Sequence, residues 1–335
     1  MQCHQGEGWF LPHRDEVTFK PVILSISGPV LLPEERDFFA GFQPLGFILF
    51  GRNVVDIPQL KKLCADLRAS VGRDDCPILI DQEGGRVRRL RPPHWRDYPA
   101  MKNIGDLDDK DALIETIRGI SGDLNEVGID VDCAPVLDVL FPQTHEAIGS
   151  RAFSDDPHRV AALGLLACEV FLDEGITPVI KHVPGQGRAS LDSHYDLPVV
   201  EASLQALEES DFIPFRHVID SPYIDRIWGM VSHIVYPAID ADHPASTSAK
   251  LIEMVRKHLG FNGLLVSDDL CMNALCRYGS PADRVAKTLE SGMDIALYCA
   301  GNLNEMIDIA KACPPLREES LKRYDRSRVR GRSAA

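Results

Sequence analysis

Short apolar segments recur along the chain, and each is followed by a longer segment whose apolar residues have helical spacing. The apolar segments are rich in β-branched residues and do not alternate with polar ones, which is typical of strands buried on both faces of a sheet. They cover residues 21–27, 45–50, 76–81, 128–135, 177–182, 227–233, 263–268 and 294–299.

The intervening segments begin near Pro, Ser or Asp, and several end near Gly, as helices do. They cover residues 33–40, 57–71, 108–127, 157–174, 202–219, 248–259, 280–291 and 302–312. Eight strand–helix repeats in about 250 to 300 residues predict an α/β protein with a single (β/α)8 TIM barrel. We expect an N-terminal extension (1–20), the barrel domain (21–315) and a C-terminal tail (316–335) that forms a closing helix.

Composition and charge narrow the class of protein. Of 335 residues, 44% are hydrophobic and 26% are charged, and no apolar run is long enough to cross a bilayer. Fifty acidic against 36 basic residues give a formal charge of -14, which disfavours binding to nucleic acid or to an anionic membrane surface. The first twenty residues lack the basic start and apolar stretch of a secretory signal.

The nine cysteines are odd in number, scattered and without a C-x-x-C pair. They are Cys3, Cys64, Cys76, Cys133, Cys168, Cys271, Cys276, Cys299 and Cys313. This usage is typical of reduced thiols, and we therefore expect a cytoplasmic protein.

Polar residues stand where several of the predicted strands end. Asp81 ends the third strand, Lys181 and His182 the fifth, His233 the sixth and Asp268 the seventh. In a TIM barrel the carboxyl ends of the strands form one face, which carries the active site. The pattern therefore predicts an enzyme with its site at this face.

A carboxylate and an imidazole lie two residues apart at Asp192 and His194. In an extended segment such residues point to the same side, so Asp192 could hold His194 in one tautomer and raise its basicity. This arrangement suits a general acid/base, although a polar turn has the same sequence. Asp268 and Asp269 end an apolar strand and could supply a nucleophile, or they could cap the next helix.

Six motifs, in this order, make the chain resemble glycoside hydrolase family 3, and within it the short bacterial β-N-acetylglucosaminidases that recycle cell-wall fragments. They are Gly46 to Asn53 (GFILFGRN), Asp81 to Val87 (DQEGGRV), Ala134 to Val139 (APVLDV), Ile148 to Phe153 (IGSRAF), Lys181 to His194 (KHVPGQGRASLDSH) and Val266 to Leu270 (VSDDL). The family implies retaining hydrolysis. This reaction requires only a nucleophile, an acid/base and water, and no closed set of metal ligands is visible, so we expect neither a metal nor an organic cofactor.

The resemblance also implies residue roles. Asp268 corresponds to the nucleophile, His194 to the acid/base and Asp192 to its partner, while Asp269 is left to orientation or capping. The residues matching positions that bind the terminal N-acetylglucosamine are Asp81, Arg151, Lys181 and His182. We expect Arg86 and Asp138 either to support the sugar-binding residues from behind or to be structural, Glu83 to cap a turn and His233 to line the pocket. One departure is Gln186, where the family commonly has His.

The substrate implied by the resemblance is N-acetylglucosaminyl-1,6-anhydro-N-acetylmuramyl peptides, a small muropeptide, and the expected enzyme is a monomer or weak homodimer. A phosphorylase remains an alternative, because a histidine acid/base repels phosphate less than a carboxylate does. A metal-dependent amidohydrolase is a more distant one, in which His182, His194, His233 and Asp268 would converge on a metal ion, without the usual H-x-H or H-E-x-x-H motif. A non-catalytic sugar-binding barrel would require loss of the nucleophile or of the acid/base, and both are present.

Overall fold

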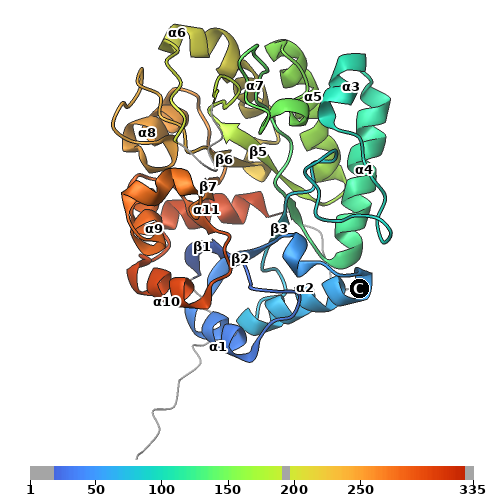
Figure 1. The fold of residues 1–335 in the computed structure, drawn as a ribbon, viewed down its shortest axis with the longest axis vertical. Coiled ribbons are helices and arrows are strands. Elements are labelled where there is room, and N and C mark those ends of the chain that lie inside the picture. Colours follow the sequence, from blue (N-terminus) through green and yellow to red (C-terminus); the bar gives the residue numbers. More distant parts are fainter. Residues whose placement is uncertain (1–18, 191–196, 329–335) are drawn as a thin grey trace, which may run out of the picture.

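The computed structural model describes residues 19–190 and 197–328. Eight parallel strands form a closed barrel in which each strand pairs with its neighbours in chain order and β8 pairs with β1 (Figure 1). The strands are β1 (Lys20–Leu24), β2 (Pro44–Leu49), β3 (Ile78–Ile80), β4 (Val131–Asp132), β5 (Thr177–Val183), β6 (Trp228–Val231), β7 (Leu265–Asp269) and β8 (Ile295–Tyr298). The predicted TIM barrel is confirmed.

Helices cover the outside of the barrel (Figure 1). They are α1 (Pro33–Phe42), α2 (Ile57–Val71), α3 (Met101–Leu107), α4 (Lys110–Val127), α5 (Pro157–Asp173), α6 (Leu204–Ala206), α7 (Phe212–Ile219), α8 (Ala249–Lys257), α9 (Pro281–Glu290), α10 (Leu303–Ala312) and α11 (Glu318–Ser327). Shorter segments are the 3-10 turns η1 (Gly51–Asn53), η2 (Gly149–Arg151), η4 (Ile224–Arg226), η5 (Ala245–Thr247) and η6 (Asn273–Tyr278), and the π-helical turn η3 (Leu207–Asp211). In the described part of the chain no helix is long and apolar enough to cross a membrane.

Helix boundaries follow the predicted signals closely. Asp56 caps α2 by accepting a hydrogen bond from the Gln59 N–H, and α2 ends at Gly72 with φ of 63°. Two features differ from the prediction. The expected helix 202–219 is divided into α6, η3 and α7, and α3 was not predicted.

Strand alternation produces two apolar layers. Val22 and Leu24 of β1 pack outward with the helices, whereas Ile23 packs inside the barrel with residues such as Leu79 and Val266. Every residue of β2 is buried. This explains why the strands read as continuous apolar runs.

The closing helix expected in the C-terminal tail is α11, which lies across the amino-terminal end of the barrel. Its Tyr324 belongs to the inner apolar cluster, and Trp228 at the start of β6 donates from Nε1 to Ser327 Oγ at 2.9 Å. Asp294, just before β8, accepts from Arg323 Nη1 at 2.9 Å. Because α11 covers this end, the carboxyl end of the barrel is the one available for a site.

Candidate active site

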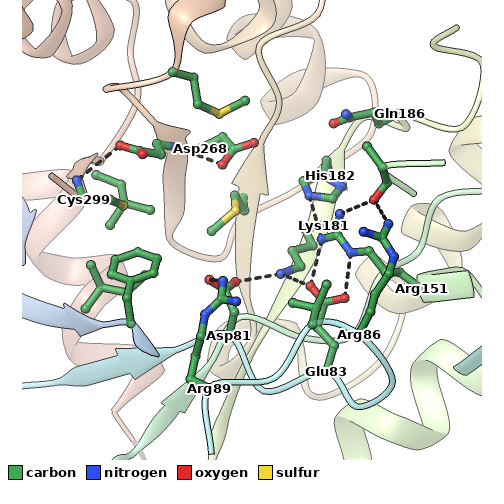
Figure 2. A pocket seen from close by; sticks show the side chains of 18 residues that line it. Asp81, Glu83, Arg86, Arg89, Arg151, Lys181, His182, Gln186, Asp268 and Cys299 are labelled. Atoms are coloured by element: carbon green, nitrogen blue, oxygen red, sulfur yellow. Dashed lines mark hydrogen bonds and ion pairs between the residues drawn. The ribbon is translucent and has the colours of Figure 1, made fainter. Parts of the chain in front are cut away.

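A cavity of about 380 Å³ opens at the carboxyl end of the strands (Figure 2). Its volume is in the range of small-ligand sites. It brings together five residues to which the sequence assigned catalysis or sugar binding: Asp81, Arg151, Lys181, His182 and Asp268. The other lining residues are Ile48, Phe50, Glu83, Arg86, Val87, Arg89, Ala147, Gln186, Met230, Asp269, Met272, Leu297 and Cys299. Asp192 and His194 lie outside the described residues.

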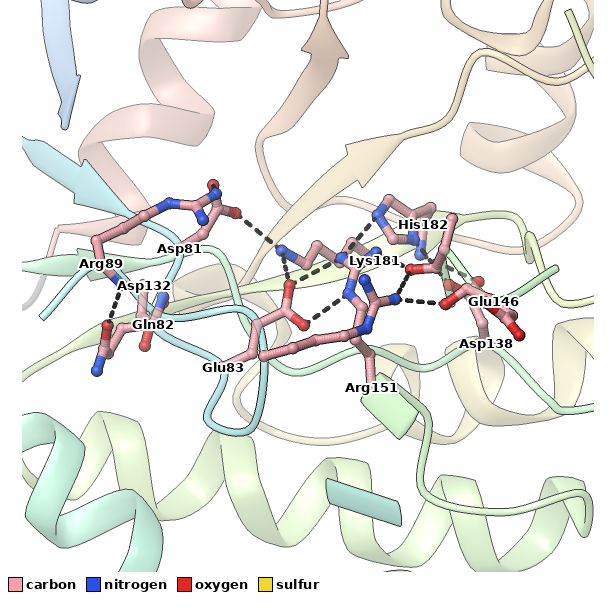
Figure 3. Close-up of polar contacts among 12 residues, drawn as sticks. Asp81, Gln82, Glu83, Arg89, Asp132, Asp138, Glu146, Arg151, Lys181 and His182 are labelled. Carbon is pink, nitrogen blue, oxygen red and sulfur yellow. Dashed lines mark hydrogen bonds and ion pairs between the residues drawn. The ribbon is translucent and has the colours of Figure 1, made fainter. Parts of the chain in front are cut away.

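Five charged side chains form a connected cluster on one side of the cavity (Figure 3). Lys181 Nζ lies 3.0 Å from Asp81 Oδ1 and 2.5 Å from Glu83 Oε1. Arg151 donates to both carboxylate oxygens of Glu83, each at 2.8 Å, and Arg89 donates to Asp81 Oδ2 at 3.0 Å. Three cations therefore hold two carboxylates in fixed orientations.

The cations decide how the two carboxylates titrate. Burial by itself would raise the pKa of Glu83, but the charges of Arg151 and Lys181 outweigh it and lower the pKa to about 2. For Asp81 burial is likewise outweighed, by Lys181 and Arg89, and its pKa lies well below the usual value. The same carboxylates raise the pKa of Lys181 against the effect of burial. Near neutral pH both carboxylates are therefore acceptors, not proton donors.

The expectation that Glu83 caps a turn is wrong. Its side chain is 2% exposed and points into the charged cluster, because only there do Arg151 and Lys181 compensate its burial. The spacing of Asp81 and Glu83, two residues apart after a strand, was a signal that could have placed both on one side. Arg89 was also missed, and no local pattern marks it.

Asp138 contacts the ring nitrogen Nδ1 of His182 and fixes the orientation of the imidazole. The nitrogen lies 2.7 Å from Asp138 Oδ2, and the carboxylate is fully buried. Asp138 Oδ1 also accepts from the backbone N–H of Gln186 at 2.6 Å. One carboxylate thus fixes two residues that line the cavity.

Asp268 lies on the other side of the cavity from Glu83 and Arg151 (Figure 2). It stands near the end of β7, and its Oδ1 accepts from the Asp269 N–H at 2.8 Å. Asp269 Oδ1 accepts from the backbone N–H groups of Cys271 at 2.9 Å and Cys299 at 3.2 Å. Burial raises the pKa of Asp269. The geometry therefore gives Asp269 the task of ordering the strand end.

His233 was expected to line the cavity, and this is wrong. It is fully buried behind β7, with Nε2 2.9 Å from the Asp269 carbonyl oxygen and Nδ1 2.7 Å from Ser246 Oγ. A carbonyl can only accept, so Nε2 carries the proton and the Ser246 hydroxyl donates to Nδ1. Burial lowers the pKa of His233, so it is a neutral support for the end of β7.

This arrangement does not favour the amidohydrolase alternative. Of its proposed ligands, His233 does not line the cavity. Over residues 19–190 and 197–328, no three His, Cys, Asp or Glu side chains come together as a metal-binding group.

Comparison with known proteins places the chain in a family. The sequence profile of the "Glycosyl hydrolase family 3 N terminal domain" matches residues 34–328. A β-hexosaminidase of Pseudomonas aeruginosa is 34% identical over 307 residues, covering 90% of each protein. A β-hexosaminidase of Neisseria meningitidis is 35% identical over 295 residues, covering 86% of this chain and 80% of that protein.

Solved structures agree with the sequence relatives. NagZ from Neisseria gonorrhoeae, in complex with N-trifluoroacetyl-D-glucosamine, has a TM-score of 0.84 and 31% identity, and the match covers 95% of this chain and 91% of that one. A family 3 β-N-acetylglucosaminidase from Paenibacillus sp. str. FPU-7 has a TM-score of 0.85 and 28% identity, covering 94% of this chain and 62% of that one. The chain belongs to glycosyl hydrolase family 3, and it is a glycoside hydrolase related to the β-hexosaminidases.

Proposed function

We propose that this protein is a retaining exo-β-N-acetylglucosaminidase. The observation that carries the proposal is one cavity in which the Asp268 carboxylate, at the end of β7, lies opposite a buried cluster of charged hydrogen-bonding groups. A small cavity at the mouth of a closed barrel suits the terminal residue of a glycan better than the middle of a chain. The relatives named β-hexosaminidase and β-N-acetylglucosaminidase support the same sugar.

In the proposed reaction Asp268 attacks the anomeric carbon, and the bond to the leaving oxygen breaks as that oxygen takes a proton from His194. Water then gives a proton back to His194 and attacks the same carbon, which releases Asp268 and the sugar with retained configuration. Asp192 would orient His194 and set its basicity. For His194 and Asp192 the proposal is based on their spacing and on the family resemblance.

Asp81, Arg151, Lys181 and His182 are proposed to bind the hydroxyls of the terminal sugar. The charged cluster supplies ionised acceptors and fixed donors, and a buried site of this kind strongly rejects sugars that lack a matching hydroxyl. Phe50 also lines the cavity, with the guanidinium groups of Arg52 and Arg89 4.9 and 5.5 Å from its ring centroid. Its ring offers an apolar surface to a sugar's C–H groups.

We propose N-acetylglucosaminyl-1,6-anhydro-N-acetylmuramyl peptides as the natural substrate, cleaved in the cytosol. Arg86 supports an anionic leaving group: it is exposed in the cavity lining and, among the described residues, has backbone carbonyl partners but no carboxylate partner. The eight cysteines of the described residues are all free thiols, which agrees with a reducing compartment.

The test compares an aryl N-acetyl-β-glucosaminide with the matching aryl β-glucoside. We expect kcat/KM to favour the N-acetyl sugar strongly, and equal or better turnover of the glucoside would refute the proposed activity. The anhydromuramyl peptide and its uncharged disaccharide counterpart then test the finer substrate. Arg86→Gln should lower kcat/KM for the peptide-bearing fragment and leave the aryl substrate almost unchanged.

A further inference from the structure

We propose that Asp138 is a positioning residue that fixes His182 as a hydrogen-bond acceptor toward the sugar. Since it requires a sugar hydroxyl in the cavity, the inference builds on the proposed function. It assigns a direction to one hydrogen bond of the site: a substrate hydroxyl must donate to His182.

The contacts of Asp138 leave little freedom. It is fully buried in the segment after β4, with Oδ2 2.7 Å from His182 Nδ1. Its other oxygen, Oδ1, accepts from the backbone N–H of Gln186 at 2.6 Å and from that of His182 at 3.3 Å. The two oxygens therefore have separate tasks, one toward the imidazole and one toward the backbone.

These contacts determine the tautomer of His182. An ionised carboxylate can only accept, so Nδ1 carries the proton. The other nitrogen, Nε2, lies 3.5 Å from Arg151 Nη2, and a guanidinium can only donate. Nε2 therefore has its single lone pair toward Arg151, and because this 3.5 Å contact is at the limit of a hydrogen bond, a sugar hydroxyl in the cavity can replace Arg151 as the donor. Lys181 and Arg151 are donors, so among these three groups His182 is the acceptor.

Replacing Asp138 with Asn should move the proton of His182 to the other ring nitrogen. The two backbone N–H groups need an acceptor, so the Asn carbonyl oxygen takes the place of Oδ1 and its NH2 group faces His182 Nδ1. Nδ1 must then accept, and the proton moves to Nε2. In Asp138→Asn, His182 would present a donor to the cavity, next to the donating Arg151.

Substrates with one hydroxyl replaced by fluorine test the direction, because fluorine can accept but cannot donate. We would measure kcat/KM for aryl N-acetylglucosaminides fluorinated singly at C3, C4 or C6, in the native enzyme and in Asp138→Asn. At the position whose hydroxyl donates to His182 the native enzyme should lose roughly 10- to 100-fold beyond the inductive effect of fluorine, and a hydroxyl that donates to Asp81 should show a loss of its own. In Asp138→Asn the loss of kcat/KM caused by fluorine at the position that faces His182 should be smaller by a factor on the order of ten. The losses at the other two positions should stay unchanged. The inductive effect cancels, because it is the same in both enzymes.

Asp294→Asn is the matched control. Asp294 is also a buried carboxylate with backbone and side-chain donors, but it lies at the amino-terminal end of β8, beside α11. The Asp294→Asn substitution should lower the melting temperature. It should not change the ratio of kcat/KM between any fluorinated substrate and its parent. If Asp138→Asn behaves in the same way, Asp138 is merely structural and the proposal is wrong.

Nitrogen-15 NMR of the native enzyme with labelled histidine tests the tautomer without any Asp138 variant or substrate. His182→Gln assigns the resonance. We expect a protonated Nδ1 and an unprotonated Nε2 near neutral pH, and the opposite tautomer or a doubly protonated ring would overturn the proposal. Failure to hydrolyse N-acetylglucosaminides would refute the proposed function and leave this spectroscopic result standing.

Discussion

Replacing Glu83 with Gln tests whether the charged cluster positions the sugar-binding groups or supplies a catalytic proton. Glu83 accepts two charged hydrogen bonds from Arg151, each at 2.8 Å, and forms an ion pair with Lys181 at 2.5 Å. The amide of Gln keeps the shape but removes the charge and turns an NH2 group toward these donors. Both cations then lose their fixed orientation.

The size of the expected loss of stability in Glu83→Gln follows from the pKa of Glu83. Its value of about 2, against the ordinary 4.5, corresponds to about 3 kcal/mol of stabilisation at neutral pH. Glu83→Gln should therefore lower the melting temperature by roughly 5 °C at pH 7. If the transition state feels the same loss, kcat/KM falls on the order of 100-fold.

The pH dependence has a definite sign. Because the folded pKa of Glu83 is lower than its unfolded value, its contribution is complete above about pH 5 and is lost as the pH falls toward 2. We would measure the melting temperatures of the native enzyme and of Glu83→Gln from pH 7 to pH 3. The gap between the two melting temperatures should be largest at neutral pH and should narrow below about pH 4.5.

Two results would refute this reasoning. A gap that stays constant with pH would mean that Glu83 has the same pKa in the folded and the unfolded protein, so that the cations do not stabilise its charge. A loss of activity confined to substrates with poor leaving groups would make Glu83 the proton donor. Glu35→Gln is the matched control, because Glu35 is buried and, within residues 19–190 and 197–328, accepts only from the backbone N–H groups of Ser27 and Leu32, each at 3.0 Å. It should cost some stability and leave kcat/KM unchanged.

Three further predictions concern the chemistry. His194→Ala should slow glycosides with poor leaving groups on the order of 10² to 10⁴-fold and activated aryl glycosides far less, whereas equal losses would mean that His194 only binds substrate. Dialysis against a strong chelator should leave activity intact, and a loss restored by zinc would support the amidohydrolase alternative. In phosphate buffer the product should be the free sugar, and accumulation of a sugar 1-phosphate would identify a phosphorylase.

The barrel could be predicted from the sequence because burial on both faces makes each strand a continuous apolar run. The lengths of the strands could not be predicted. Residues 128–135 indicated one strand, but β4 is only Val131–Asp132, and beyond it lies an isolated bridge from Val136 to Lys181. Pairing with both neighbouring strands, and not local composition, limits the ladder. Helix α3 was missed because its start has no side-chain cap, and it packs through Gly105 against the backbone of Phe153, a contact that no local pattern reveals.

The candidate site was predictable where residues stand at strand ends, as for Asp81, Lys181 and Asp268. The ion pair of Arg151 with Glu83 was not, because it joins loops 68 residues apart and depends on the direction of both side chains. The interruption of the expected helix 202–219 at η3 could not be predicted either. Arg188, from the segment after β5, donates to Asp211 and Ser210 there, at 2.7 and 2.8 Å. Such tertiary contacts leave no local pattern in the sequence.

The central claim is that Asp268 forms a covalent bond to the anomeric carbon of an N-acetylglucosaminide. A slowly hydrolysed fluorinated N-acetylglucosaminide, followed by proteolysis and mass mapping, tests it most directly. The account predicts one sugar adduct on Asp268 and a product of retained configuration, because a nucleophile fixed at a strand end is poised for attack. An adduct on Asp269, or a product of inverted configuration, would contradict it.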